Sequence, residues 1–221
     1  AFATLALLAT FWTVSEPTVL VWTFGLWVLV CVTSALSVHF QRHRTWDEIV
    51  AKVAEAGNPA PLVAEYKGAQ GVGDVVTTAP LAAGGTTSFT IQAPASFNYF
   101  SVAAMLFPTN DEFMGLSVAR LPQPGQRLTY WVNAWDADAK VDDELCADMA
   151  PTPNATVFPV PECAGVNGSG YTGSVPATAR VHIANGIHGN GDLPADVYDW
   201  RNPVAKITIS NLAGSAHSGS N

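Results

Sequence analysis

The first forty residues of the chain are almost entirely apolar. Val19–Val38 is a run of twenty residues without a charged side chain, and the polar segment Gln41–Arg44 follows it. A helix of about twenty apolar residues is long enough to cross a bilayer, and the tryptophans within and beside the run suit a membrane interface. The pattern therefore predicts a membrane-anchor segment over residues 1–44, built from one or two helices.

The same run has a second interpretation, as core strands of a β-sandwich. It is rich in Val, Thr, Trp and Phe, which favour strands. An uninterrupted apolar run has no periodicity that separates a buried strand from a buried helix. Both structures fit the residues, and we expect the membrane helix.

Beyond residue 44 the pattern changes. Thr45–Gly57 carries apolar residues on one helical face; Thr45 and Glu48 have the spacing of a capping box, and Gly57, followed by prolines, is a suitable end. Further along, short apolar runs alternate with turn signals. The predicted strands are 86–92, 99–106, 115–120, 127–134, 179–183 and 204–210. This spacing is typical of an antiparallel sandwich. We therefore expect one mainly β domain with one short helix over residues 45–211, and a flexible tail over 212–221.

Charge and cysteine usage narrow the function classes. The chain has 18 acidic and 10 basic residues, a formal net charge of −8, which disfavours nucleic acid as a partner because phosphate binding depends on Lys and Arg. Cys146 and Cys163 flank a Pro-rich loop. We expect them to form a disulfide rather than remain free thiols, and hence an oxidising compartment. Arg42 and Arg44 would place the domain in the cytoplasm, but two arginines are a weaker signal than the cysteines.

Two acidic segments are the strongest candidates for a functional site. Asp111 and Glu112 follow one apolar run, and Asp136 and Asp138 follow another, with Asp142, Asp143 and Glu144 shortly afterwards. Ca²⁺ takes six to eight oxygen ligands from carboxylates, carbonyls and water, so loop carboxylates gathered at one end of a sandwich suit it. Residue types alone are equally compatible with ordinary solvated turns.

Four segments in this order resemble the spondin domain of bacterial exported proteins. They are Ser101–Leu116, Trp135–Cys146, Gly186–Leu193 and Tyr198–Ala205. The resemblance implies a C2-like antiparallel β-sandwich that binds Ca²⁺ through loop aspartates. By position, the metal ligands would be Asp111, Asp136, and either Asp142 or Asp143. Asp138 stands where the family usually has glycine, so it either adds a ligand or alters the turn. The family's opening strand is not recognisable in Val19–Val38.

His182, His188 and Asp192 form a second constellation. Two histidines and a carboxylate can bind Zn²⁺ or non-haem iron, but we expect His188 and Asp192 to organise the glycine-rich loop by hydrogen bonds instead. The sequence thus predicts a non-enzymatic, Ca²⁺-binding, membrane-anchored domain on the periplasmic or extracellular side, which mediates adhesion or assembly with protein partners. The alternatives are an accessory subunit of a larger integral membrane complex, and a metalloenzyme that uses the two histidines and Asp192.

Overall fold

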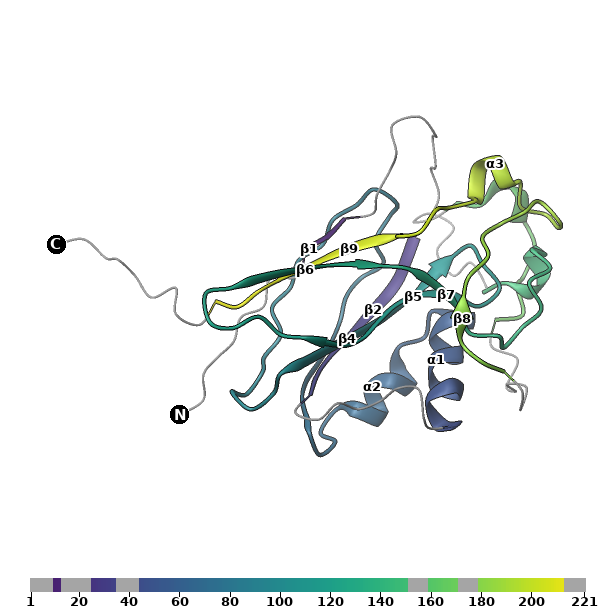
Figure 1. The fold of residues 1–221 in the computed structure, drawn as a ribbon. Helices are drawn as coiled ribbons and strands as arrows, with labels where there is room; N and C mark the ends of the chain where they lie inside the picture. The colour runs from purple at the N-terminus through teal and green to yellow at the C-terminus, as the bar shows by residue number, and fades with distance from the viewer. Residues whose placement is uncertain (1–9, 13–24, 35–43, 151–158, 171–178, 213–221) are drawn as a thin grey trace.

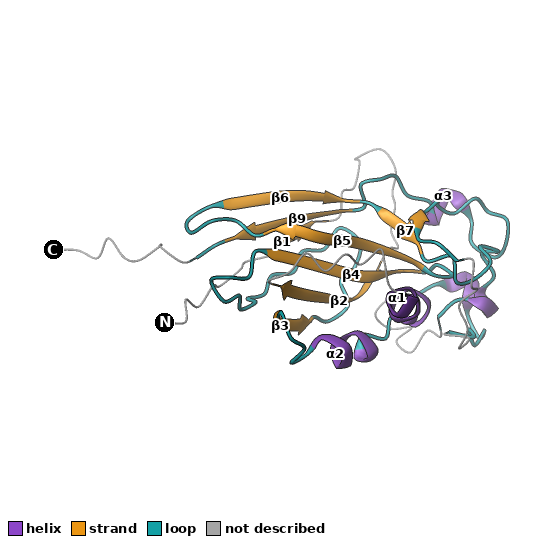
Figure 2. Cartoon of the chain, turned by 60° about the horizontal axis from the view of Figure 1, so that its bottom comes forward, coloured by secondary structure: helices purple, strands orange, loops and turns teal. Residues whose placement is uncertain are grey.

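The chain folds into two antiparallel β-sheets that share one core. The computed structural model describes residues 10–12, 25–34, 44–150, 159–170 and 179–212. The smaller sheet has the order β1-β9-β6 and the larger one β3-β2-β4-β5-β7-β8 (Figures 1 and 2). The strands are β1 (Thr10–Trp12), β2 (Gly25–Ser34), β3 (Val72–Thr77), β4 (Tyr99–Phe107), β5 (Glu112–Arg120), β6 (Arg127–Val132), β7 (Ala134–Asp136), β8 (His182–Ile183) and β9 (Ala205–Ser210). The predicted mainly β, antiparallel fold is confirmed.

Alternating side chains fill the space between the sheets. In β9, Ala205, Ile207 and Ile209 are fully buried, and they belong to the same apolar cluster as Phe100 and Val102 of β4. Successive residues of a strand point to opposite faces, so one face of each strand builds this core.

The second face of the larger sheet is covered by helix α1 (Arg44–Ala56). Val50, Ala51 and Ala54 of α1 pack with Ala103 of β4 and Phe113 of β5. Strand β4 is consequently buried along nearly its whole length. The helix ends as predicted, because Gly57 has a φ of +59° and its N–H donates to the carbonyl of Val53 at 2.8 Å.

The structure describes more helices than the single one predicted. Helix α2 (Ala60–Tyr66) begins directly after Pro59 and carries Pro61 in its first turn. Proline is tolerated at the start of a helix, where its missing N–H has no partner to lose. The prolines that end α1 therefore also begin α2. A third helix, α3 (Ala195–Tyr198), and two 3₁₀ turns, Cys146–Asp148 and Pro161–Cys163, lie in the loops at one end of the sheets.

The predicted membrane helix over Val19–Val38 is wrong for the residues that the structure describes. Gly25–Ser34 forms β2, which pairs with β3 on one side and β4 on the other. A central strand and a buried helix can share the same uninterrupted apolar run, so the composition alone did not distinguish them. Within the described ranges, no helix is both long and apolar enough to cross a membrane. Apart from β1, β2 and Arg44, the first residue of α1, segment 1–44 lies outside the described residues.

Other strand predictions were partly right. The predicted strand 86–92 is irregular, because the N–H of Gln92 bonds to the carboxylate of Asp74 at 2.8 Å rather than to a neighbouring strand. Predicted strand 127–134 is divided near Asn133: β6 belongs to the smaller sheet and β7 to the larger.

The Cys146–Cys163 disulfide is present, with a Cα–Cα distance of 5.4 Å. The tail from residue 213 lies outside the described residues.

Candidate metal centre

Asp111 is held at one end of the larger sheet by the turn between β4 and β5. Thr109 closes this turn, since its hydroxyl donates to the carbonyl of Leu106 at 2.5 Å and accepts the N–H of Glu112 at 3.2 Å. Asp111 is the last residue before β5 and its side chain is fully buried. The turn therefore presents a carboxylate from inside the protein rather than from a solvated loop.

Asp136 reaches the same place from the last position of β7. The register of β5 and β7 puts it opposite Glu112, the residue after Asp111, and opposite residues of an antiparallel pair project to the same face. Its side chain is 2% exposed, and one oxygen accepts the N–H of Asp138 at 2.5 Å. Asp138 has a φ of +52° and its own carboxylate accepts the N–H of Arg180 at 2.9 Å. Of the two roles expected for Asp138, an added ligand or an altered turn, its positive φ and its bond to Arg180 match the turn.

The two oxygens of Asp111 have different surroundings. Oδ2 accepts the N–H of Ala139 at 2.7 Å and that of Lys140 at 3.0 Å. Oδ1 is buried and has no hydrogen-bond partner. A buried oxygen of this kind costs about 1–3 kcal/mol, and more when it is charged. One half of the carboxylate fixes the loop after β7, and the other half is available for a ligand.

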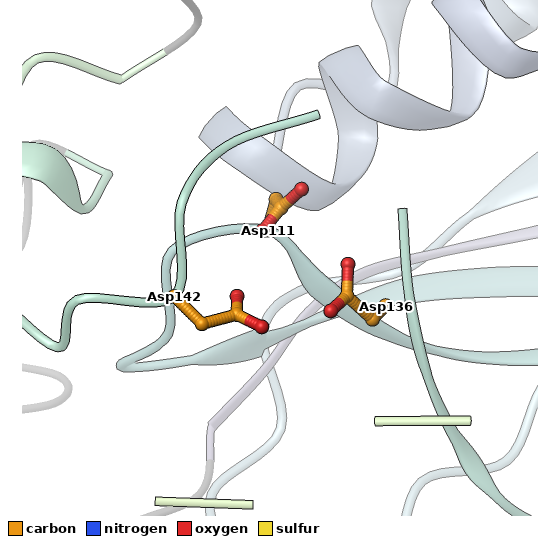
Figure 3. A group of neighbouring side chains, drawn as sticks. All are labelled: Asp111, Asp136 and Asp142. Carbon is orange, nitrogen blue, oxygen red and sulfur yellow. The ribbon is translucent and has the colours of Figure 1, made fainter. Parts of the chain in front are cut away.

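Asp142 completes a group of three carboxylates. One oxygen from each of Asp111, Asp136 and Asp142 lies within 4.8 Å of the other two, and their carboxyl groups gather around a common space (Figure 3). Asp142 is exposed to solvent, whereas the other two are buried. The group therefore has a closed inner side and an open outer side.

Asp143 takes no part in this group. Its Oδ1 accepts the side-chain amide of Asn110 at 2.9 Å and the N–H of Leu145 at 3.0 Å. The same Asn110 side chain accepts the N–H of Glu144 at 3.2 Å. These bonds clamp Asp143 and Glu144 to the turn beside Asp111. Of the two sequence candidates for the third position, Asp142 is the one that meets the other carboxylates.

The group is electrostatically unfavourable without a cation. Burial, and then the charge of Asp136, raises the pKa of Asp111 to about 6. Burial, a hydrogen bond with Asp136 and the charge of Asp136 raise the pKa of Asp142 to about 8. Close like charges and desolvation both disfavour ionised carboxylates. A divalent cation is the simplest group that would reverse both effects.

Two further charged residues lie beside the group: Glu112, which the sequence placed in the acidic segment without a role, and Lys140, which it did not single out. Glu112 is buried next to the group, and burial, followed by the charge of Asp142, raises its pKa well above the ordinary value. The side chain of Lys140 is 6% exposed; its ammonium donates to the carbonyl of Asp148 at 2.5 Å and lies 3.8 Å from Glu55. Its position in the acidic segment after β7 gives no sign in the sequence that its side chain is buried.

The second predicted constellation does not form. His182 Nε2 lies 3.6 Å from Asp136, His188 Nδ1 lies 3.7 Å from Glu144, and Asp192 accepts the N–H of Cys146 at 2.9 Å. The three side chains thus have different partners and do not share a metal position among the described residues. The transition-metal site that this set offered as an alternative therefore has no support in the positions of the three side chains.

Glu144, which belongs to the second acidic segment but was not nominated as a ligand, organises the glycine-rich loop instead. Its carboxylate is buried, and its two oxygens accept the backbone N–H groups of His188 and Asn190, each at 2.6 Å. Gly191 packs so closely that a Cβ there would collide with the carbonyl oxygens of Asp143 and Glu144. The expected role of His188 and Asp192, loop organisation by hydrogen bonds, matches these contacts.

Comparison of the sequence with known protein families and with curated proteins gives no match.

Proposed function

We propose that this chain is a Ca²⁺-binding, spondin-like β-sandwich. The observation that carries the proposal is the buried, unpartnered Oδ1 of Asp111, with oxygens of Asp136 and Asp142 close by. Carboxylate oxygens are the ligands that Ca²⁺ prefers, at 2.3–2.6 Å. Two oxygens bound to one such ion lie at most about 5 Å apart, so the mutual distances of up to 4.8 Å accommodate it.

The cation would act structurally. Asp111 and Asp136 each commit one oxygen to a backbone N–H in the loop after β7, and a bound ion would tie the remaining oxygens to the exposed Asp142. The turn before β5, the end of β7 and the loop that carries Asp142 would then move as one unit. Water molecules on the open side would complete the coordination.

We place the activity in adhesion or protein–protein assembly outside the reducing cytoplasm, without catalysis. The Cys146–Cys163 disulfide supports an oxidising compartment. Exposed apolar side chains are neighbours in sequence of the residues at the cation group: Val141 precedes Asp142, and Val181 and Ile183 flank His182. Exposed apolar residues around a rigid polar centre are typical of a surface that binds another protein. The cation would hold these loops in their binding conformation.

The test is a Ca²⁺ titration of chelator-treated protein by calorimetry, with thermal unfolding in parallel. Ca²⁺ at one hundred times its Kd stabilises the folded state by about 2.7 kcal/mol, which for a domain of this size raises Tm by roughly 5–10 °C. The variant Asp142→Asn should weaken Ca²⁺ binding by about tenfold or more. Asp143→Asn is the matched control, since its amide oxygen can still accept the bonds to Asn110 and Leu145. Equal Tm values in EDTA and Ca²⁺, or a weaker Ca²⁺ affinity only in the control, would refute the site.

A further inference from the structure

His182 lies directly across from a member of the cation group. Strand β8 pairs with β7, and the register places His182 opposite Asp136. Opposite residues of an antiparallel pair project to the same face, and Nε2 of the imidazole is accordingly 3.6 Å from Oδ2 of Asp136. The imidazole is 47% exposed, so it borders the open side of the group.

The contact of Nδ1 determines the tautomer of the ring and hence the state of Nε2, the nitrogen that faces Asp136. Nδ1 of His182 is 3.1 Å from the carbonyl oxygen of Ile183. A carbonyl can only accept, so Nδ1 carries the proton and the neutral ring has its lone pair on Nε2. Metal-bound histidines are commonly oriented in this way, with the other nitrogen donating to a backbone carbonyl.

The two oxygens of Asp136 have different neighbours. Oδ1 accepts the N–H of Asp138, whereas Oδ2 is the atom near His182. Two lone-pair atoms that face each other need a proton or a cation between them. Donors to a first-row ion bound at about 2.1 Å lie roughly 3.0–3.4 Å from their neighbours, so a movement of a few tenths of an ångström would let one ion bind both atoms.

The buried Oδ1 of Asp111 is a second, independent sign that this position takes a ligand, because it has no hydrogen-bond partner. Asp111, Asp136 and Asp142 supply three oxygen donors that lie within 4.8 Å of one another. Nε2 of His182 lies outside this group of three, 3.6 Å from Oδ2 of Asp136, and would become a fourth donor of another element when its exposed ring turns toward the ion. Imidazole suits first-row transition ions, whereas Ca²⁺ prefers oxygen. The fourth donor therefore bears on which ions the site accepts.

We propose that His182 is a metal ligand that extends the cation site from Ca²⁺ to first-row divalent ions such as Mn²⁺. This inference rests on the proposed cation site and adds a nitrogen to its donors. Ca²⁺ would be held by the carboxylates and water without needing the imidazole. A first-row ion would bind the imidazole in addition to the carboxylates, and this extra ligand would raise the affinity of the site for that ion.

His188 provides an internal control of the same residue type. It is 56% exposed and its Nδ1 lies 3.7 Å from a carboxylate oxygen of Glu144, much as His182 lies beside Asp136. Both oxygens of Glu144, however, already accept backbone N–H groups. A metal next to His188 would therefore have no free carboxylate oxygen from Glu144.

The experiment compares the tag-free full chain with its His182→Ala and His188→Ala variants. Mn²⁺ and Ca²⁺ are titrated separately by calorimetry, and the Mn²⁺ complex is examined by pulsed electron paramagnetic resonance for ¹⁴N coupling. We expect His182→Ala to weaken Mn²⁺ binding by about tenfold or more, to change Ca²⁺ affinity by less than about threefold, and to abolish the ¹⁴N coupling. His188→Ala should change none of the three.

The outcomes separate this inference from the proposed function. Ca²⁺ binding with no ¹⁴N coupling to Mn²⁺, or an equal loss of both ions in His182→Ala, overturns the role of His182 and leaves the carboxylate site intact. Failure of the unmodified chain to bind either ion overturns both. If the ¹⁴N coupling were retained in His182→Ala and lost in His188→Ala, the metal-bound nitrogen would belong to His188. That result would also refute the proposal.

Discussion

Asp111 and Glu144 are two buried carboxylates at the same end of the molecule, and they differ in how many of their oxygens accept hydrogen bonds. Each oxygen of Glu144 accepts one backbone N–H at 2.6 Å. Asp111 accepts two N–H groups on Oδ2 and none on Oδ1. The two are linked through Asn110, which precedes Asp111 and accepts the N–H of Glu144.

The difference shows what separates a structural acid from a candidate ligand. An exposed histidine lies beside a buried carboxylate in both regions, at 3.6 and 3.7 Å, so residue type and proximity do not distinguish them. Hydrogen bonding of the individual oxygens does. Both oxygens of Glu144 are satisfied within its loop, whereas Asp111 has a raised pKa and acidic neighbours, and in the proposed function a cation would satisfy its remaining oxygen.

Isosteric amide substitutions should therefore have opposite effects in the two regions. Glu144→Gln replaces one accepting oxygen by an NH₂ group that faces a backbone N–H. Loss of a hydrogen bond to a charged acceptor, with a buried donor left unsatisfied, costs about 2–3 kcal/mol. We expect the free energy of unfolding in urea to fall by this amount equally in EDTA and in Ca²⁺.

The control for that measurement is Glu65→Gln on the exposed side of α2, where surface substitutions change stability by less than about 0.5 kcal/mol. If the loss in Glu144→Gln disappeared when Ca²⁺ was added, Glu144 would belong to the cation site and the contrast with Asp111 would fail.

Asp111→Asn should instead stabilise the metal-free protein. The amide oxygen can accept the N–H groups of Ala139 and Lys140, and the NH₂ group can donate toward Asp136 or Asp142, which removes a buried charge without a partner. We expect a gain of about 1 kcal/mol in EDTA and loss of the Ca²⁺-induced rise in Tm. Urea unfolding with and without Ca²⁺ measures both. A variant that is less stable in EDTA and still responds to Ca²⁺ would contradict the proposed role of Asp111.

The sequence predicted those parts of the fold whose signals are local. Helix α1 has an apolar face and ends at Gly57, and every second residue of β9, from Ala205 to Ile209, is apolar and buried. Strand β2 was taken for a membrane helix because its apolar run is uninterrupted. Its partners, β3 and β4, lie far along the chain, and only that pairing distinguishes a central strand from a helix.

The candidate site shows the same division. The resemblance nominated Asp111 and Asp136, which the structure brings together with Asp142. The choice between Asp142 and Asp143 depends on Asn110, which lies in a different loop and holds Asp143 away. His182 was assigned to another set of residues, because the register of the two-residue strand β8 has no signature in the sequence.

The pH dependence of the metal-free protein provides the finest test of the comparison. The folded-state pKa of Asp111 is raised to about 6 and that of Asp142 to about 8, whereas both carboxyls have ordinary values near 4 when unfolded. Between these limits the folded state binds more protons, so its stability falls as pH rises from about 4 to 8. In EDTA, the Tm of the unmodified chain minus that of Asp111→Asn should be near zero at pH 5 and negative by about 1–3 °C at pH 8.

Saturating Ca²⁺ should reverse that trend, because the ion binds the ionised carboxylates and protons compete with it. The same difference in Tm should then become positive and grow as pH rises. Glu144→Gln serves as the reference: its difference from the unmodified chain should be much less sensitive to Ca²⁺, since its oxygens are already held by backbone N–H groups. A Tm difference for Asp111→Asn that is independent of both pH and Ca²⁺ would mean that the two buried carboxylates are alike.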